Sequence, residues 1–131
     1  MAGIVELDLL LKSMIPEVKN GEYVFCTVGG NSLEYVHLNP LATFVEPEGL
    51  TLIVSVEAAE KAQLSYESTF KQITLTVHSS LDAVGLTAAV ATKLASYDIS
   101  ANVVAAYYHD HIFVQTEKAE EALLALKEFS E

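Results

Sequence analysis

The sequence predicts an α+β protein made of two related halves, the first of them abbreviated. Segments with strand-like alternation and segments with helix-like periodicity follow one another in both halves. A hairpin-then-helix pattern also occurs twice, because Leu52-Ile53-Val54 returns as Ile112-Phe113-Val114. The composition, 51% hydrophobic and 19% charged, is typical of a globular protein with a sizeable core.

The C-terminal half has the clearest pattern. Residues 70–78 alternate, with Ile73, Leu75 and Val77 on one face, which predicts a half-buried strand. An amphipathic helix follows at 84–97, with Leu86, Val90 and Leu94 on its buried stripe. Two strands at 102–107 and 112–115 and a final helix complete the order β-α-β-β-α.

The N-terminal half is predicted to be an abbreviated version of the same unit. A short helix precedes Pro16, a strand covers 22–28, and a hairpin at 42–56 turns at Glu46-Pro47-Glu48-Gly49 before a helix at 57–64. Residues 33–40 have no clear period, so the long helix of the other half has no equivalent here. We therefore expect an N-terminal half over 1–68 and a C-terminal half over 69–131.

A β-α-β-β-α unit without a final strand leaves one edge of its sheet open. A strand from the other half or from another chain usually covers such an edge. Because duplicated units with open edges can pair symmetrically, we expect a homodimer.

Charge and cysteine content exclude several classes of partner. Seven basic residues against eighteen acidic ones give a net charge of −11, which disfavours both nucleic acid and membrane surfaces. The single cysteine, Cys26, cannot form an intrachain disulfide and lies in an apolar strand. No apolar stretch approaches the ~20 residues of a membrane span. These features predict a cytoplasmic protein.

Part of the C-terminal half resembles a known family. The stretch Ile73-Thr-Leu-Thr-Val-His-Ser-Ser-Leu-Asp-Ala-Val-Gly85-Leu-Thr-Ala-Ala89, with Ile99-Ser-Ala-Asn-Val-Val-Ala-Ala-Tyr107 and Asp110-His-Ile-Phe-Val114, is similar to an ACT domain. More narrowly, it resembles small bacterial ACT-domain proteins related to aspartokinase regulatory tails and to animal arginine sensors. The resemblance covers about half the chain and extends weakly to Gly49-Leu-Thr-Leu-Ile-Val54.

The resemblance implies two ferredoxin-like halves of βαββαβ type, with antiparallel sheets that carry helices on one face. It also implies an amino-acid effector and no catalysis in the unit itself. In such domains the effector lies against the loop between the first strand and the first helix, here residues 79–85. Free N–H groups and the positive dipole end at a helix N-terminus also suit a carboxylate. Gly85 lets a ligand come close to the backbone because it has no Cβ. The predicted ligand-binding residues are Ser80, Asp82, Ala83, Val84, Gly85, Leu86 and Asp110.

Each polar candidate also has an ordinary structural interpretation. Asp82 is either a partner for the effector's ammonium group or an N-cap of the helix. Ser80 is a ligand contact or a turn residue, and Asp110 borders the pocket or stabilises a turn by local hydrogen bonds.

Other functions have less support in the sequence. No Gly-x-Ser-x-Gly elbow accompanies the serines and histidines, so we predict no catalytic residues and no enzyme activity. His109 and His111 have no clear third ligand, so we predict neither a metal nor another cofactor. The main alternative to an amino-acid binding protein is an oligomerisation or interaction module with no small ligand.

Overall fold

The computed structural model describes residues 6–77 and 85–131. Contacts between residues group the chain into two compact units, one made of 1–20 and 71–131 and the other of 21–70. We call the first the split unit and the second the inserted unit. The division into domains at 68/69 stays a prediction, and in this grouping residues 1–20 belong with the C-terminal residues.

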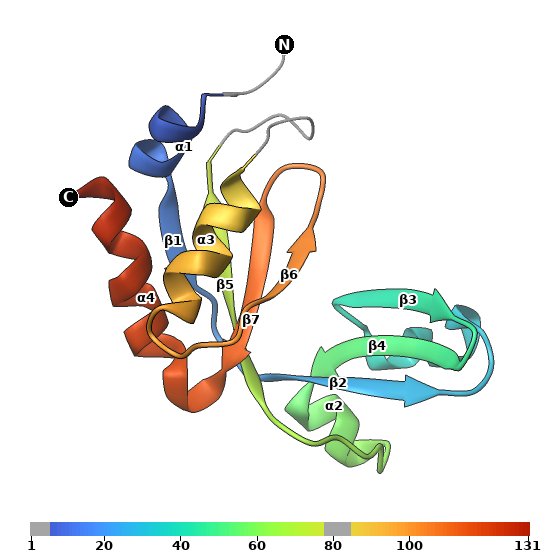
Figure 1. Cartoon of the computed structure of the whole chain (residues 1–131). Coiled ribbons are helices and arrows are strands. Elements are labelled where there is room, and N and C mark those ends of the chain that lie inside the picture. Colours follow the sequence, from blue (N-terminus) through green and yellow to red (C-terminus); the bar gives the residue numbers. More distant parts are fainter. Residues whose placement is uncertain (1–5, 78–84) are drawn as a thin grey trace. The chain divides into compact units, whose positions relative to one another are not determined.

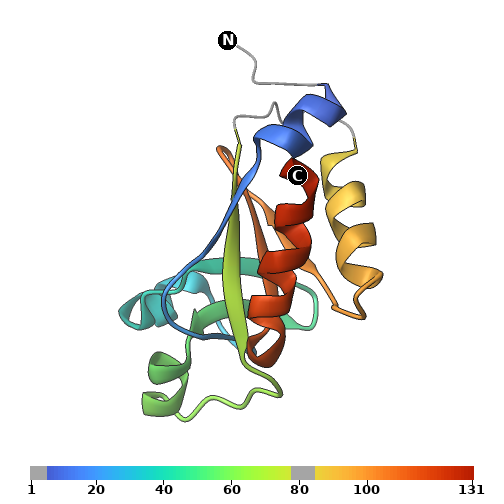
Figure 2. The same cartoon turned by 90° about the vertical axis from the view of Figure 1, so that its left-hand side faces the viewer.

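The split unit is an antiparallel sheet with helices on one face (Figures 1 and 2). Strand β5 (Phe70–Thr76) lies between β1 (Ile15–Val18) and β7 (Asp110–Gln115), and β6 (Asn102–Ala105) follows at the other edge. The helices are α1 (Leu7–Ser13), α3 (Leu86–Ala95) and α4 (Ala119–Lys127), with 3₁₀ turns at Thr116–Lys118 and Glu128–Ser130. This is the predicted α+β, ferredoxin-like arrangement.

Strand β1 is the element that the sequence pattern did not reveal. The predicted helix ends before Pro16, as α1 does at Ser13, and the chain then continues as a strand in which Pro16 lies opposite Leu75 and Val18 opposite Ile73. Proline is tolerated here because β1 is an edge strand, where one side needs no backbone donor. The missing final strand of the C-terminal sheet therefore comes from the N-terminal segment of the same chain.

The core of the split unit lies between the sheet and its helices. Ile73 and Leu75 of β5 pack with Leu86, Val90 and Leu94 of α3, as the alternation and the helical stripe predicted. Helix α1 contributes Leu10, which is fully buried, and α4 contributes mainly alanines, which let its backbone approach closely. The remaining members of this core are Met14, Val77, Ile99, Ile112, Val114, Ala119, Ala122, Ala125 and Leu126.

The face of this sheet away from the helices carries a polar cluster. Gln72 and Thr74 are buried, and the Nε2 of Gln72 and the Oγ1 of Thr74 lie 3.1 and 3.0 Å from Nδ1 of His111. Burial lowers the pKa of His111, the charge of His109 and that of Lys19 lower it further, and Asp110 opposes them. A neutral His111 therefore suits this environment, with Nδ1 accepting hydrogen bonds from its neighbours.

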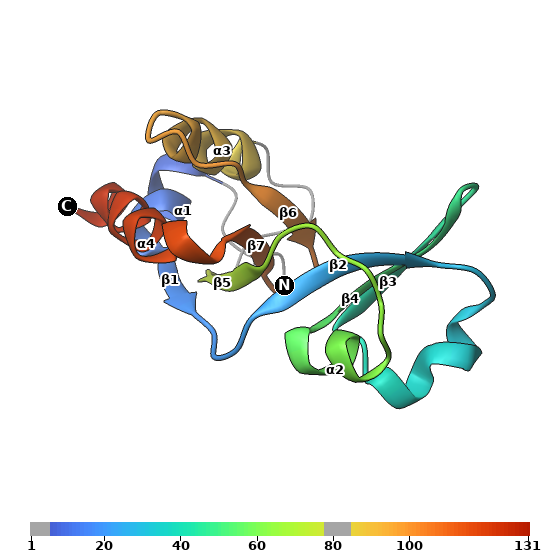
Figure 3. The ribbon, with the colours of Figure 1, turned by 90° about the horizontal axis from the view of Figure 1, so that it is seen from below.

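The inserted unit contains a three-stranded sheet in the order β3-β4-β2 (Figure 1). Figure 3 shows the helical segments of this unit on one side of its strands. Its elements are β2 (Tyr23–Val28), the 3₁₀ helix η1 (Ser32–Leu38), β3 (Ala42–Glu46), β4 (Gly49–Ser55) and α2 (Val56–Lys61). Val24 and Cys26 of β2 and Leu52 and Val54 of β4 pack with Ala59 of α2. The pair β4–α2 corresponds to β7–α4 of the split unit, as the internal repeat predicted.

Helix η1 stands where the split unit has the longer α3. The Asn31 side chain accepts from Leu33 N at 3.0 Å, and the Glu34 carboxylate accepts from Asn31 N at 2.9 Å, which together form a capping box. The turn ends at Asn39, whose φ of 51° is left-handed, and Pro40 follows. The first half is thus abbreviated as predicted, and the Asn-x-x-Glu spacing was the signal for the short helix.

We expect Leu10→Ala to lower the free energy of unfolding by about 2–5 kcal/mol, because it removes a fully buried side chain and leaves a cavity. Leu9→Ala is the matched control, since Leu9 is 49% exposed and should change stability by about 0.5 kcal/mol or less. Urea unfolding measures both. Equal effects of the two substitutions would mean that α1 does not belong to this core.

We also expect His111 to make stability fall as the medium is acidified. The pKa of His111 is below its ordinary 6.5 in the folded chain, so the unfolded chain binds this proton more readily. The free energy of unfolding should then decrease as pH falls through about 6.5 towards the lower folded pKa, and level off below that.

The measurement is chemical unfolding at several pH values between about 7.5 and 5.5, around the ordinary histidine pKa. His111→Asn should flatten the dependence on pH, whereas His37→Asn, at an exposed histidine of the inserted unit, should keep it. A wild-type slope in His111→Asn would contradict the assignment.

Candidate functional site

The structure describes only part of the predicted effector site. Ser80, Asp82, Ala83 and Val84 lie outside the described residues. Gly85 and Leu86, at the start of α3, and Asp110, at the start of β7, lie within them. The starts of α3 and β7 are at the same end of the split unit (Figures 1 and 2). The described candidates therefore lie at one end of this unit, and their role in ligand binding stays a prediction.

Gly85 precedes α3 in a conformation that requires glycine. Its φ of 100° and ψ of −16° are left-handed, a region that residues with a Cβ rarely adopt. A Cβ built at this position would lie 3.2 Å from Cδ2 of Leu7, so α1 occupies that side. The backbone and the packing of Leu7 thus explain this glycine, and its role in ligand approach stays a prediction.

Leu86 can contact a ligand only through its backbone N–H group. Its side chain is 5% exposed and belongs to the core. The N–H groups of the first turn of an α-helix have no partner inside the helix, so those at the start of the ten-residue α3 can bind an anion.

Asp110 is a strand residue and not the turn residue of the alternative interpretation. It pairs with Ala105, while the turn between β6 and β7 is closed by Ala106 N donating to His109 O at 3.1 Å. Asp110 alternates with Ile112 and Val114, which belong to the core, so its side chain projects from the helix-bearing face. It is half-buried, and burial raises its pKa, although the charges of His111 and His109 lower it.

His109, next to Asp110, carries a buried polar atom, Nδ1, for which the described residues supply no hydrogen-bond partner. Such atoms are rare in proteins because an unpaired buried polar group costs free energy. Sequence reasoning considered His109 as a catalytic base, as a metal ligand or as a turn residue, and not as a contact for an amino acid. Among the described residues no three histidine, cysteine or acidic side chains gather closely enough to hold a metal ion.

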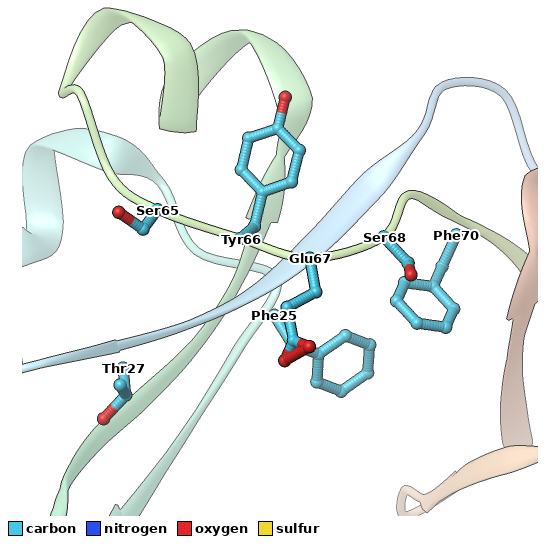
Figure 4. A pocket seen from close by; sticks show the side chains of 7 residues that line it. All are labelled: Phe25, Thr27, Ser65, Tyr66, Glu67, Ser68 and Phe70. Carbon is cyan, nitrogen blue, oxygen red and sulfur yellow. The ribbon is translucent and has the colours of Figure 1, made fainter.

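A second candidate site, which sequence reasoning missed, lies in the inserted unit (Figure 4). It is a hollow of about 490 Å³. We call it the β2 hollow, because β2 forms one side of it and the segment between α2 and β5 forms the other. This segment has no hydrophobic periodicity, so no sequence pattern predicted the hollow. The lining residues are Phe25, Thr27, Ser65, Tyr66, Glu67, Ser68 and Phe70.

No helix in the described part of the chain is long and apolar enough to cross a membrane. No curated protein matches the chain. Two family models do match it. One described as an ACT domain matches residues 2–71, and another described as an ACT domain matches residues 67–128.

Solved structures agree with these matches. A Vibrio cholerae protein of unknown function, described as a possible transport protein, is 62% identical over 95% of this chain and 96% of its own, with a TM-score of 0.90. An Agrobacterium tumefaciens protein is 13% identical over 89% of both chains, with a TM-score of 0.70. The ligand-free regulatory subunit of aspartate kinase from Thermus thermophilus is 12% identical over 92% of this chain and 99% of its own, with a TM-score of 0.62.

The last two similarities concern the fold alone. The family models together span nearly the whole chain, and the first of them covers more than half of it. The ferredoxin-like sheet of the split unit and the internal repeat are the structural counterpart of these two matches. The chain belongs to the ACT-domain family and contains two such domains in tandem.

Proposed function

We propose that this protein is a non-catalytic regulatory protein that binds an amino acid where α3 begins. The observation that carries the proposal is the buried Nδ1 of His109, which has no partner within the described residues and adjoins the half-buried carboxylate of Asp110. Leaving such a nitrogen unpaired costs about 1–3 kcal/mol. A ligand that satisfies it would therefore gain free energy on binding.

An amino acid matches the chemistry expected at this end of the split unit. Its carboxylate would accept hydrogen bonds from backbone N–H groups of residues 83–86, where the helix dipole also favours an anion. Its ammonium group would pair with Asp110 or Asp82. Ser80, Ala83, Val84, Gly85 and Leu86 complete the proposed set of contacts.

The family supports a regulatory role. ACT domains are regulatory modules that commonly bind amino-acid effectors, and the fold is similar to regulatory subunits of aspartate kinase. We extend the proposal to the cytoplasm, because Cys26 is a free thiol, as suits a reducing compartment.

A second candidate function is that of an interaction module, and the surface of the inserted unit favours it. Strand β3 is an edge strand whose Phe44 and Val45 are 70% and 82% exposed. Leu33 and Val36 of η1 are also exposed. Apolar edge strands pair readily with other strands. We therefore propose a homodimer that pairs through β3, with or without a small ligand.

For the amino-acid site, we expect at least one common amino acid to raise the melting temperature when it is present in large excess, because it binds only the folded state. Calorimetry with that amino acid should then give about tenfold weaker binding for Asp110→Asn, which removes the charge that pairs with the ammonium group.

Asp98→Asn is the matched control. Asp98 is an exposed residue of the same unit with a left-handed φ of 61°, which asparagine accepts, so binding should stay unchanged. If no amino acid changes the melting temperature, the interaction module becomes the better explanation. Equal loss of affinity in both variants would place the site elsewhere.

For the dimer, we expect light scattering to give about twice the monomer mass of 14.2 kDa. Val45→Lys should shift the protein towards the monomer, because a lysine on an edge strand opposes further pairing. Leu124→Lys is the control, since Leu124 is an equally apolar residue that is 64% exposed on α4. A monomeric wild type at every concentration would contradict this proposal.

A further inference from the structure

The β2 hollow is separate from the proposed amino-acid site, because all of its lining residues belong to the inserted unit. Its volume of about 490 Å³ falls within the range of pockets that take small molecules. It combines two phenylalanines with one carboxylate and several hydroxyl groups. This combination of side chains limits what the hollow can bind.

Two aromatic rings form the apolar part of the hollow. The rings of Phe25 and Phe70 meet edge to face, with centroids 5.1 Å apart and an interplanar angle of 72°. The face of an aromatic ring is electrostatically negative, so it attracts a cation that lies over it. Figure 4 shows the carboxylate of Glu67 beside the ring of Phe25. A positive group placed here would meet both a ring and a full negative charge.

Within the described part of the chain, no cationic side chain forms an ion pair with this carboxylate. The Tyr66 hydroxyl donates to Glu60 at 2.6 Å, and in Figure 4 its ring extends away from Glu67. Residues 21–70 contain seven glutamates and a single lysine, Lys61, which does not line the hollow. The surrounding charge thus attracts cations and repels anions.

We propose that the β2 hollow binds a small organic cation, an amine carried on an aromatic or apolar group. The ammonium group lies against Glu67 and over a phenylalanine ring, while the apolar part of the ligand packs on Phe25 and Phe70. A carboxylate-bearing ligand without an amine has no favourable partner in this hollow.

The test is an NMR titration of the full-length protein with benzylammonium, and with benzyl alcohol and benzoate as neutral and anionic analogues. Benzylammonium should shift the backbone amides of Phe25, Thr27 and residues 65–70, and the alcohol should bind about fivefold more weakly. Benzoate should leave these amides unchanged. Equal affinity for the amine and the alcohol, or no shift with the amine, would overturn the proposal.

Two variants and a control assign the contacts. Glu67→Gln should weaken benzylammonium binding about fivefold, and Phe70→Leu, which keeps the bulk but loses the ring, about threefold. Glu48→Gln, at an exposed glutamate in the β3–β4 turn, should have no effect. If Glu48→Gln weakens binding as much as Glu67→Gln, general attraction to an acidic surface explains the result and the proposed site is wrong.

This outcome is independent of the amino-acid site. Asp110→Asn should leave benzylammonium binding unchanged, because Asp110 belongs to the split unit. Loss of benzylammonium binding in Asp110→Asn would show that the amine occupies the amino-acid site, and would refute the assignment to the β2 hollow.

Discussion

The antiparallel pairing of β1 with β5 is the interaction on which the division of this chain into units depends. Val18 lies opposite Ile73. The next residue, Lys19, donates a hydrogen bond of 2.8 Å from its N–H to Gln72 O, which extends the pairing almost to the start of the inserted unit. This pairing covers an edge of the sheet that would otherwise be open to other chains. It also joins α1 to the split unit, and Leu10 of α1 packs in the core with residues of α3 and α4. Strands β1 and β6 are the edges of this sheet, and the edge at β3 of the inserted unit is the better candidate for contacts with a second copy because Phe44 and Val45 are exposed on it.

Much of the fold followed from local patterns, and the parts that did not have physical reasons. Alternation predicted β5, and the recurrence of one hairpin and helix predicted both β4–α2 and β7–α4, because each of these elements buries one regular face. Strand β1 was not predicted, because proline usually interrupts regular secondary structure. Pro16 is compatible with a strand only because β1 lies at the edge of the sheet. The strand that pairs with β1 is also distant in sequence, so no local pattern predicts their pairing. Helix η1 was not predicted, because a short 3₁₀ helix has no amphipathic period. The spacing of Asn31 and Glu34, which form its capping box, was present in the sequence.

The candidate sites were less predictable than the fold. Periodicity placed Gly85 and Leu86 at the start of a helix, and the structure puts Asp110 at the same end of the sheet. Ser80, Asp82, Ala83 and Val84 stay predictions from the family resemblance. The role of His109 depends on the accessibility of one nitrogen atom, which no sequence pattern reports. The β2 hollow depends on how an aperiodic segment passes a strand, which is again a tertiary property. The two proposed sites also differ in chemistry. The site at the start of α3 needs a ligand with both a carboxylate and an ammonium group, whereas the β2 hollow needs an ammonium group on an apolar body.

The place of the inserted unit in the chain has a consequence for synthesis on the ribosome. Residues 21–70 are contiguous and make their own sheet and core, so they have all of their partners as soon as they leave the ribosome. Strand β1 is made earlier but pairs with Ile73–Thr76, which are made only after the whole inserted unit. Closing a loop costs less entropy when the loop is already compact, because its ends are then held close together. Tyr23 pairs with Phe70 within the inserted unit, and this brings its two ends side by side. The order of synthesis therefore favours a sequence in which the inserted unit folds first and β1 then pairs with β5.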